Sequence, residues 1–596
     1  MGKGAQVVNE FDVIVVGAGA GGMAAAVSAA KNGASVIVIE KDKVLGGTTA
    51  RSGGVLWIPC HPFSQQSPAE DSIENATTYL RHEAGRYFNA EKVQAFLHNG
   101  PRMVDWFQRE TDVKFVSVPE FSDYHPDAAG GLPGGRSILA APFDGRELGK
   151  KIEWLRPPLR EITFVGMMFN ASKEISQFFN VTRSLASAWY VTKRLVTHAR
   201  EMLTYGRAMR LTNGNALAAR LAKSAFDCDI PFRLDTRVER LLMEGRRVAG
   251  VAVNSGGESM NLYARTGVIL AGGGFPQDVE RRKALFPHAP NGTEHLSPAP
   301  ASNTGDGLRL AANAGAALEL DLPNAAAWIP VSKVPYRNGE SGVFPHLIDR
   351  YKPGVIMVTR NGLRFTNESN SYHDVGMAMQ KACRDSDATE AFLICDHRTL
   401  RRYGLGFVKP FPIPFGPHLR SGYLKRGRTL AELADAAGID AAAFERTVAT
   451  FNEGAVHGED HQFGRGNSAY NRFLGDAEHQ PNPCVAPIQD GPFYAIRTVI
   501  GDLGTFAGIR TDGCARALDS SGHVVPGLYA VGNDAASVMG GNYPGGGITL
   551  GPAMTFGFLA GEHAAKTARG ARENALSLDM PVAEVSVLAR SSEQAP

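Results

Sequence analysis

A glycine-rich turn between two short apolar runs is the clearest chemical signal in this chain. The turn, GAGAGG at 17–22, follows the run 11–16 and precedes an alanine-rich stretch, and a second apolar run at 35–39 ends at Glu40. Glycine at the first, third and sixth positions allows a tight turn, close approach of the backbone to a pyrophosphate, and close contact of helix and strand. An acid after the second strand can accept a hydrogen bond from a ribose hydroxyl and disfavours a 2′-phosphate. This order of strand, turn, helix, strand and acid predicts a dinucleotide-binding unit whose helix start offers N–H groups to the phosphates.

Further glycine clusters indicate a cofactor longer than the AMP half of a dinucleotide. Residues 46–54 read GGTTARSGG, the apolar run 268–275 ends in a glycine triplet and a phenylalanine, and the run 527–533 contains Gly532. Glycine in short clusters marks backbone that must come close to another group. The residues that we expect to contact the cofactor are Gly17, Gly19, Ala20, Gly22, Glu40, Lys41, Gly46, Gly47, Thr48, Thr49, Ser52, Gly53, Gly54, Ala271, Gly272, Gly273, Asp306, Gly532, Asn533, Gly547, Ile548 and Leu550.

Composition excludes several classes of protein. Hydrophobic residues make up 43% and charged residues 20% of the 596 positions, which excludes a disordered chain, a coiled coil and a collagen-like chain. The 62 basic and 60 acidic residues leave a net charge of +2, too small to indicate a nucleic-acid-binding protein. The six cysteines form no CxxC pair, so we expect no metal centre and a cytoplasmic protein. We find neither a secretory signal nor an apolar stretch of the roughly 18 residues that a membrane span needs.

The order of these segments predicts more than one domain, as the chain length also does. The nucleotide-binding signals lie near both ends of the chain, and the middle differs from them in its proline-rich loops and in helical segments such as 430–453. We therefore expect an α/β protein with a Rossmann-like FAD-binding domain split in sequence and an inserted α+β catalytic cap. The expected parts are 1–330 (FAD-binding), 331–492 (cap), 493–575 (FAD-binding) and a flexible tail at 576–596.

Four stretches together resemble one flavoprotein family. They are the nucleotide unit with Glu40, GGTTARSGGVLWIP (46–59), NGLRFTNESNSYHDV (361–375) and NYPGGGITLGPAMTFGFLAG (542–561). The chain is similar to the fumarate reductases and 3-ketosteroid dehydrogenases, and SGGVLWIP with YPGGG favours the 3-ketosteroid 1-dehydrogenase branch. The likeness implies an oxidoreductase acting on CH–CH groups, which would remove hydrogens from carbons 1 and 2 of a 3-ketosteroid in steroid or sterol degradation. FAD would take up the electrons and an unidentified acceptor would receive them.

The resemblance also assigns roles to four residues. The Tyr543 hydroxyl and the Gly547 backbone N–H would donate hydrogen bonds to the C3 carbonyl. Glycine suits position 547 because a side chain there would crowd flavin or substrate. Tyr372 would be the base that takes the C2 proton, and Tyr124 would support it. Tyrosine has a pKa of about 10, so such a base needs help near neutral pH. The family often has two adjacent aromatic residues at the supporting position, whereas His125 follows Tyr124 here and could share the role.

Two departures bear on the branch and on the cofactor. No arginine follows Asn367-Glu368 closely, which counts against a dicarboxylate substrate, and this pair could simply brace the cap. The related succinate dehydrogenases carry a histidine beside the second glycine cluster that binds flavin covalently. No histidine lies within 46–54 here, so this departure from the relatives implies non-covalent FAD. The alternatives are another desaturase or ene-reductase of the family, such as a 4-ene-forming 5α-ketosteroid dehydrogenase or a fumarate-type reductase, and a non-catalytic flavin or electron-transfer protein.

The segment 161–210 permits two interpretations. Between Val181 and Arg210 it has six Lys or Arg residues and one acid, Glu201, with aromatic and aliphatic residues among them. A basic amphipathic helix can lie on an anionic membrane surface. The interpretation that we favour is that its apolar face packs on the flavin domain, with its charges solvated. The alternative is peripheral contact with the inner face of the cell membrane.

Overall fold

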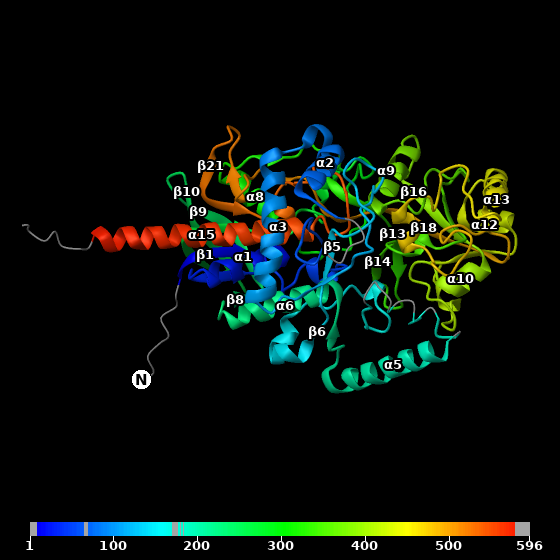
Figure 1. Ribbon diagram of the computed structural model, residues 1–596, viewed down its shortest axis with the longest axis horizontal. Helices are drawn as coiled ribbons and strands as arrows, with labels where there is room; N and C mark the ends of the chain where they lie inside the picture. The colour runs from blue at the N-terminus through cyan, green and yellow to red at the C-terminus, as the bar shows by residue number, and fades with distance from the viewer. Residues whose placement is uncertain are drawn as a thin grey trace, which may run out of the picture.

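Two large β-sheets organise the part of the chain that the computed structural model describes, which comprises residues 9–64, 70–169, 174, 177–178, 180–182 and 184–578. The first sheet has eight strands in the order β20-β21-β11-β1-β2-β8, with β10 and β9 following on from β11 (Figure 1). The pairs among β21, β11, β1, β2 and β8 are parallel, and those that involve β20, β10 or β9 are antiparallel. The strands are β1 (Glu10–Val16), β2 (Val36–Ile39), β8 (Phe232–Arg233), β9 (Thr236–Glu244), β10 (Arg247–Ser255), β11 (Glu258–Leu270), β20 (Arg516–Leu518) and β21 (Val524–Ala530).

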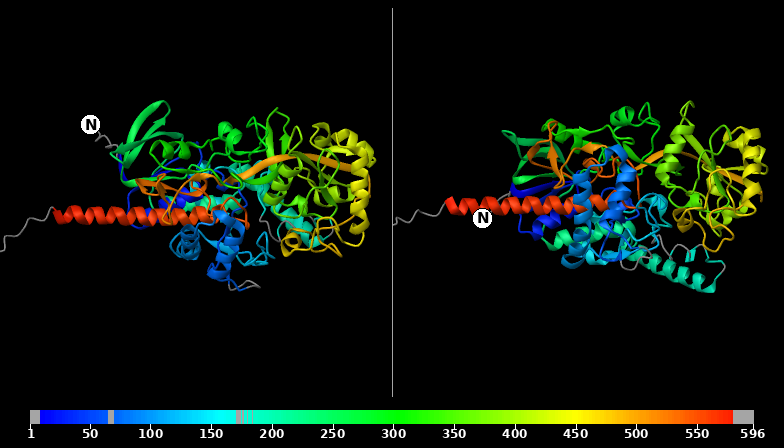
Figure 2. Two further views of the ribbon diagram at one scale, coloured as in Figure 1. Left: turned by 90° about the horizontal axis from the view of Figure 1, so that it is seen from above. Right: turned by 45° about the horizontal axis from the view of Figure 1, so that its top comes forward.

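The two ends of the chain meet on this sheet, as the split domain requires. Helix α1 (Ala20–Lys31), between β1 and β2, packs along α15 (Leu550–Leu578), the long red helix of Figure 2. Two glycines of α15 allow this contact, because a Cβ at Gly557 or Gly561 would lie 2.4 Å from a carbonyl oxygen of α1. The predicted strands 11–16 and 35–39 are confirmed as β1 and β2. The expected tail lies outside the described residues from 579 onward, and its first residues belong to α15.

The second sheet belongs to the cap and is antiparallel throughout. Its order is β14-β13-β18-β16-β15, with β17 paired to β18. The strands are β13 (Ala326–Pro335), β14 (Ser341–Pro345), β15 (Val355–Val358), β16 (Glu390–Cys395), β17 (Lys425–Gly427) and β18 (Phe493–Thr505). The sheet therefore takes in residues on both sides of the range expected for the cap, 331–492, because β13 begins before it and β18 follows it. Figure 2 shows β18, in orange, reaching from the cap towards the first sheet.

Helices cover the cap sheet, and one expected helix is two. The cap helices are α9 (Tyr372–Ala382), α10 (His397–Tyr403), α11 (Gly416–Arg420), α12 (Leu430–Ala437), α13 (Ala441–Ala455) and α14 (Ala469–Leu474). The prediction of a single helical segment at 430–453 was wrong, because α12 and α13 are separate helices. Gly438, with φ +71°, ends α12 in the left-handed conformation, and the Asp440 side chain caps α13 by accepting the Ala443 N–H.

A third, small sheet lies between these bodies and carries part of the site. It consists of β3, β5 and β4, all antiparallel, with α2 and α3 nearby. The remaining elements are β3 (Val55–Trp57), β4 (Phe115–Ser117), β5 (Ser137–Ala140), β6 (Phe143–Asp144), β7 (Arg210–Leu211), β12 (Leu318–Glu319), β19 (Gly508–Ile509), α2 (Ile73–Ala84), α3 (Ala90–Glu110), α5 (Leu185–Tyr205), α6 (Asn213–Asp227), α7 (Val279–Leu285), α8 (Asp306–Asn313) and the 3-10 helices η1 (Thr49–Arg51), η3 (Gly85–Tyr87), η4 (Gly145–Trp154), η5 (Arg160–Ile162), η6 (Asp349–Tyr351) and η7 (Gly532–Asp534).

Helix α5 lies at the edge of the molecule (Figure 1). Its buried residues are Ser187, Val191 and His198, whereas Leu185, Trp189 and Leu203 are 91%, 73% and 89% exposed. The favoured interpretation, that the apolar face of this segment packs on the flavin domain, is therefore wrong for these residues. Arg183, counted among the basic residues, lies outside the described part of the chain. Among the described helices, none combines the length and apolar character needed to cross a bilayer.

Candidate active site

A cleft runs along the carboxyl ends of β1, β2 and β11. In the sheet, β1 has its parallel neighbours β2 and β11 on either side, and the turn 17–22 leaves its end. Gly17 has φ +112°, and a Cβ there would lie 2.2 Å from the Ala271 carbonyl oxygen. A Cβ at Gly22 would lie 2.0 Å from the Gly17 carbonyl oxygen, so this glycine allows α1 to pack on the turn, as predicted. Gly19, by contrast, has no neighbour nearer than 3.8 Å on its open side.

Most of the predicted cofactor residues line this cleft. Those that do are Gly17, Gly19, Ala20, Glu40, Lys41, Gly47, Thr48, Thr49, Ser52, Ala271, Gly272, Gly273, Asp306, Gly532, Asn533 and Leu550. Gly22, Gly46, Gly53, Gly54, Gly547 and Ile548 are not among its lining residues. Of these, Gly54 has φ +71° and would place a Cβ 2.3 Å from the Asn213 carbonyl carbon, so it fits the loop against the start of α6.

Short polar contacts hold the rim of the cleft in shape. The Glu40 carboxylate accepts the N–H groups of Ala18 at 2.8 Å and Asp42 at 2.9 Å. Burial raises the pKa of Glu40, and these two hydrogen bonds oppose the rise. The Lys41 ammonium lies 2.6 Å from the Asp306 carboxylate. The hydrogen bonds from Ala18 and Asp42 therefore hold the Glu40 carboxylate at the end of β2, where we expect a ribose.

Sequence reasoning missed several lining residues. Asp534 is buried, and its carboxylate accepts the N–H groups of Gly272 at 2.6 Å and Gly274 at 2.8 Å, which joins the two glycine turns. The Asn303 amide donates to the Thr48 hydroxyl at 3.0 Å. Asp534 directly follows the predicted Gly532 and Asn533, so an acid after a strand-ending glycine was a usable signal. Asn303 lies in an irregular loop, and its sequence context gave none.

The cleft fits an extended dinucleotide. Its wall is mostly glycine backbone and short side chains, and Gly19, at the start of α1, provides no side-chain cap for the helix. Backbone N–H groups at such a helix start suit a phosphate. Thr549, Leu550 and Ala553, at the start of α15, close the other end of the cleft. These residues would hold FAD between β2 and α15.

Three tyrosines predicted to be catalytic converge from distant parts of the chain. Tyr124 lies in the loop between β4 and β5, Tyr372 is the first residue of α9, and Tyr543 precedes α15. The Tyr124 hydroxyl donates to the Tyr372 hydroxyl at 2.8 Å. The Tyr124 and Tyr543 rings stack with centroids 5.4 Å apart, and the Tyr372 ring meets Tyr543 edge-on at 5.0 Å. All three are at most 6% exposed.

The pKa values of Tyr372 and Tyr543 are raised to different extents. Burial raises the pKa of Tyr372 well above 10, as does the neighbouring Tyr543, whereas the hydrogen bond with Tyr124 lowers it. Burial raises the pKa of Tyr543 to about 12, against hydrogen bonds with Tyr372, the Thr549 side chain and the Gly547 backbone. The two groups expected to act as donors, the Tyr543 hydroxyl and the Gly547 N–H, are therefore neighbours.

The backbone around Gly547 requires glycine at this position. Its φ is +101°, and a Cβ there would lie 2.4 Å from the Val55 carbonyl oxygen. Its carbonyl accepts the N–H groups of Trp57 at 3.2 Å and Gly551 at 2.9 Å. A side chain at 547 would therefore clash with the backbone of β3. The expectation that it would also crowd flavin or substrate stays a prediction.

The aromatic cluster extends beyond the predicted set. The Tyr470 ring lies 4.5 Å from Tyr124, centroid to centroid, and its hydroxyl lies 2.6 Å from that of Tyr351. Nothing in the sequence distinguished these two tyrosines from the rest. Both ring nitrogens of His125 face carboxylates, so its side chain does not share Tyr124's hydrogen bond to Tyr372.

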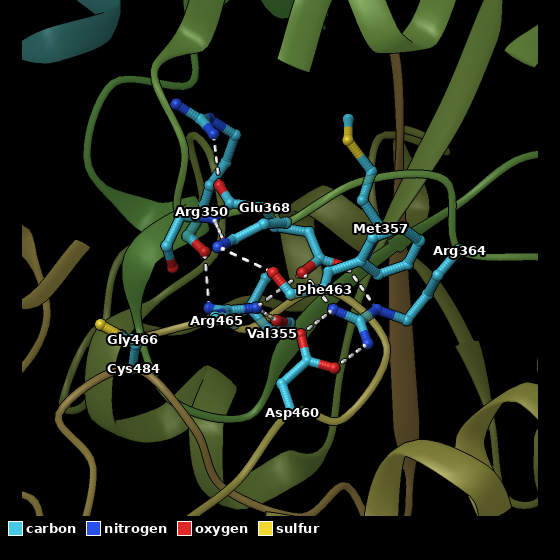
Figure 3. A network of polar contacts seen from close by, with 12 residues as sticks. Arg350, Val355, Met357, Arg364, Glu368, Asp460, Phe463, Arg465, Gly466 and Cys484 are labelled. Carbon is cyan, nitrogen blue, oxygen red and sulfur yellow. Dashed lines mark hydrogen bonds and ion pairs between the residues drawn. The ribbon is translucent and has the colours of Figure 1, made fainter. Parts of the chain in front are cut away.

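Glu368 braces the cap. Figure 3 shows its carboxylate between Arg364, at 2.8 Å, and Arg465, at 3.2 Å, with Arg364 also bound to Asp460 at 2.8 Å. Glu368 also accepts the Met357 N–H at 3.0 Å. Burial would raise the pKa of Glu368, but Arg364 lowers it overall. The bracing role considered for Asn367-Glu368 agrees with these contacts, and both arginines are occupied within the cap.

Residues 12–550 match the FAD binding domain family, which spans more than half of the chain. A 3-oxosteroid 1-dehydrogenase of Mycobacterium tuberculosis is 38% identical over 573 residues, 94% of this chain and 99% of that protein. The chain belongs to the family of FAD-dependent flavoproteins that contains these dehydrogenases. A 4-oxocyclohex-2-ene-1-carboxylate 5-dehydrogenase of Sinomonas cyclohexanicum is 42% identical over 570 residues, 96% of each chain.

A solved structure supports the same assignment. The 3-ketosteroid delta1-dehydrogenase from Sterolibacterium denitrificans, in complex with 1,4-androstadiene-3,17-dione, has a TM-score of 0.87 and 35% identity and covers 94% of this chain and 100% of its own. The predicted family, the split α/β fold with a cap, the oxidoreductase class and the FAD cofactor are thereby confirmed.

Proposed function

We propose that this flavoprotein desaturates the bond between carbons 1 and 2 of 3-ketosteroids. The observation that carries the proposal is the convergence of Tyr124, Tyr372 and Tyr543, with a hydroxyl-to-hydroxyl hydrogen bond of 2.8 Å inside a buried cluster. The names of the Mycobacterium tuberculosis and Sterolibacterium denitrificans relatives support the substrate class.

The proposed residue roles follow from the donors and acceptors in the cluster. The Tyr543 hydroxyl and the Gly547 N–H donate to the C3 carbonyl oxygen, which acidifies the C2 hydrogen because the enolate-like charge is stabilised. Tyr372 takes that proton at its phenolate oxygen, and Tyr124 stabilises the phenolate by donating to it. Bound FAD supplies the hydride acceptor for the hydrogen on C1. An unidentified electron acceptor then takes the two electrons.

A second substrate deserves comparison because of the Sinomonas relative. A 4-oxocyclohexene carboxylate has the same ketone and adjacent C–H bonds, so the same tyrosines could act on it. Its carboxylate would need a cationic partner, and a fumarate-type dicarboxylate would need more than one. Arg364 and Arg465 do not provide these, because they are held by Glu368 and Asp460.

The experiment that tests the proposal is anaerobic mixing of FAD-loaded protein with three compounds in parallel. They are 4-androstene-3,17-dione, 4-oxocyclohex-2-ene-1-carboxylate and succinate, and the readout is loss of the oxidised flavin absorbance. We expect rapid loss with the steroid only. Rapid loss with the carboxylate and none with the steroid would replace the proposed substrate, and loss with succinate would restore the fumarate-type alternative.

We also propose that α5 makes peripheral contact with an anionic lipid surface. Its exposed apolar residues Leu185, Trp189 and Leu203 accompany exposed Lys193 and Arg200. Apolar and aromatic groups can enter the headgroup region while basic groups attract anionic lipid. A steroid partitions into lipid, so such contact would bring the enzyme to its substrate.

Sedimentation with vesicles tests this contact. The wild type should sediment with vesicles that contain phosphatidylserine and be released by salt, because screening weakens the attraction. The double variant K193E/R200E should stay in the supernatant, with steroid turnover preserved. The matched control K425E/R426E makes the same charge change on exposed β17 and should sediment. Equal sedimentation of both variants, or self-association of α5 without lipid, would refute the proposal.

A further inference from the structure

His125 lies between two carboxylates from different elements. Its Nδ1 is 2.9 Å from Glu83 at the end of α2, and its Nε2 is 2.9 Å from Asp374 in the first turn of α9. A neutral imidazole carries a single N–H, so both contacts are hydrogen bonds to carboxylates only when the ring is an imidazolium. Burial lowers the pKa of His125, but the bonds to Asp374 and Glu83 raise it to about 10. The ring is therefore a cation at neutral pH.

The His125–Asp374 pair joins the two backbone segments that carry Tyr124 and Tyr372. His125 directly follows Tyr124, and Asp374 lies two positions after Tyr372 on α9. The Ser371 side chain accepts the Asp374 N–H at 3.1 Å and caps the same turn. The ion pair thus connects the loop between β4 and β5 to the cap, next to the hydroxyl-to-hydroxyl hydrogen bond.

Glu83 extends the connection to the third tyrosine. Its main-chain carbonyl accepts the side-chain N–H of Asn542 at 2.7 Å, and Asn542 directly precedes Tyr543. On the preceding turn of α2, the Tyr79 hydroxyl donates to the Pro544 carbonyl at 2.6 Å and accepts the His125 N–H at 3.2 Å. The end of α2 therefore contacts the residues next to Tyr124 and Tyr543, and it is connected to α9 through His125 and Asp374.

We propose that His125 is a positioning residue, whose cationic ring holds α9 against the Tyr124 loop so that the Tyr124 and Tyr372 hydroxyls remain in hydrogen-bond contact. The proposal rests on the proposed function of Tyr372 as the base. His125 itself takes no proton from the substrate, because both of its nitrogens are engaged by carboxylates. A displacement of about 1 Å at a reacting group can cost roughly 10²-fold in rate, so a positioning role has a measurable effect.

The kinetic test compares the variant His125→Gln with the control variant His82→Gln. Glutamine can keep one of the two hydrogen bonds but has no charge, and Asp374→Asn removes the pair from the other side. We expect each variant to lose about 10- to 100-fold in kcat with little change in KM. The double variant should lose no more than the worse single one, because both remove one interaction. The control His82→Gln removes an exposed ring 3.3 Å from Glu83 that does not reach α9, and should leave kcat unchanged.

Two further readouts do not depend on turnover. Amide hydrogen exchange at 372–376, in FAD-loaded protein without substrate, should be faster in His125→Gln than in His82→Gln. The pKa of His125, about 10, lies above its ordinary 6.5, so its stabilising contribution is complete below pH 6.5 and is lost as pH rises through about 10. The difference in thermal stability between wild type and His125→Gln should therefore shrink over that range. The groups that face this ring are Glu83 and Asp374, with His82 and His373 beside them.

The outcomes separate this inference from the proposed function. If His125→Gln matches His82→Gln in both kcat and amide exchange, the positioning role is refuted. If the wild type oxidises none of the ketones while exchange at 372–376 still rises in His125→Gln, the proposed function fails and the connection between the segments stands. Loss of kcat with unchanged exchange would also overturn the positioning role, since the effect would then arise without movement of α9.

Discussion

Removal of the Tyr124 hydroxyl should move the pH dependence of catalysis without destroying the site. Tyr124 donates to Tyr372 at 2.8 Å, and this hydrogen bond lowers the pKa of Tyr372, although burial keeps that pKa well above 10. A hydrogen bond to a charged group contributes about 1.5–3 kcal/mol. Since one pKa unit corresponds to about 1.4 kcal/mol, Tyr124→Phe should raise the pKa of Tyr372 by about one to two units.

The consequence for rate depends on pH. At neutral pH the base is mostly protonated, so the rate of flavin reduction should fall by about 10- to 100-fold with the fraction of phenolate. The rate of each protein should rise with pH as the fraction of phenolate increases, and the profile of the variant should lie about one to two pH units higher than that of the wild type. The assay is anaerobic rapid mixing with 4-androstene-3,17-dione over the neutral and alkaline range.

Tyr470→Phe is the matched control for this experiment. The Tyr470 ring packs on Tyr124, but its hydroxyl bonds to Tyr351 and not to Tyr372. The control should retain the wild-type pH profile. A Tyr124→Phe profile that rises at the same pH as the wild type, with a uniform loss of rate, would refute the reasoning that Tyr124 stabilises the phenolate.

Three other predictions concern the cofactor, Gly547 and the cap. Denaturation in acid should release FAD from the protein into the supernatant, as judged by chromatography, and flavin that stays with the chain would contradict non-covalent binding. Gly547→Ala should lower the free energy of unfolding by at least about 1–3 kcal/mol, since its φ of +101° and the contact with Val55 both oppose a side chain. Gly85→Ala, at φ +51° with no neighbour within 4 Å, is the control, and an equal effect on thermal unfolding would rule out the clash. Glu368→Gln should cost about 3–5 kcal/mol in denaturant unfolding because Arg364 and Arg465 lose a buried partner. Asn361→Ala, on the neighbouring turn outside the ion pairs, should cost much less, and parity between the two would contradict the bracing role.

Local signals were sufficient for the nucleotide-binding half of the fold. The runs at 11–16 and 35–39 are largely apolar because β1 and β2 are buried on both faces, and Gly17 and Gly22 between them are required by contacts of 2.2 and 2.0 Å. The tyrosine trio could be named from motif resemblance. Its convergence could not be derived from spacing, because Tyr124 and Tyr372 lie 248 positions apart.

Long-range pairing accounts for what sequence reasoning missed. The cap sheet begins at Ala326 because β13 pairs with β18, and no local pattern reveals a partner so distant in the chain. The contact of His125 with Asp374 spans 249 positions, and that of Asn542 with Glu83 spans 459. The apolar residues of α5 were expected to be covered, since sequence gives the amphipathic pattern but not whether a neighbour exists.

Hydrogen exchange at C2 of the steroid tests the central claim, that Tyr372 takes the proton from this carbon, most directly. In D₂O, with flavin reduced beforehand by dithionite so that it cannot accept hydride, wild-type protein should introduce deuterium at C2 of 4-androstene-3,17-dione. Tyr372→Phe should lose this exchange almost completely while still binding the ketone, and Tyr543→Phe should weaken both exchange and binding. Exchange by Tyr372→Phe at the wild-type rate would contradict the account and leave Tyr124 as the candidate base.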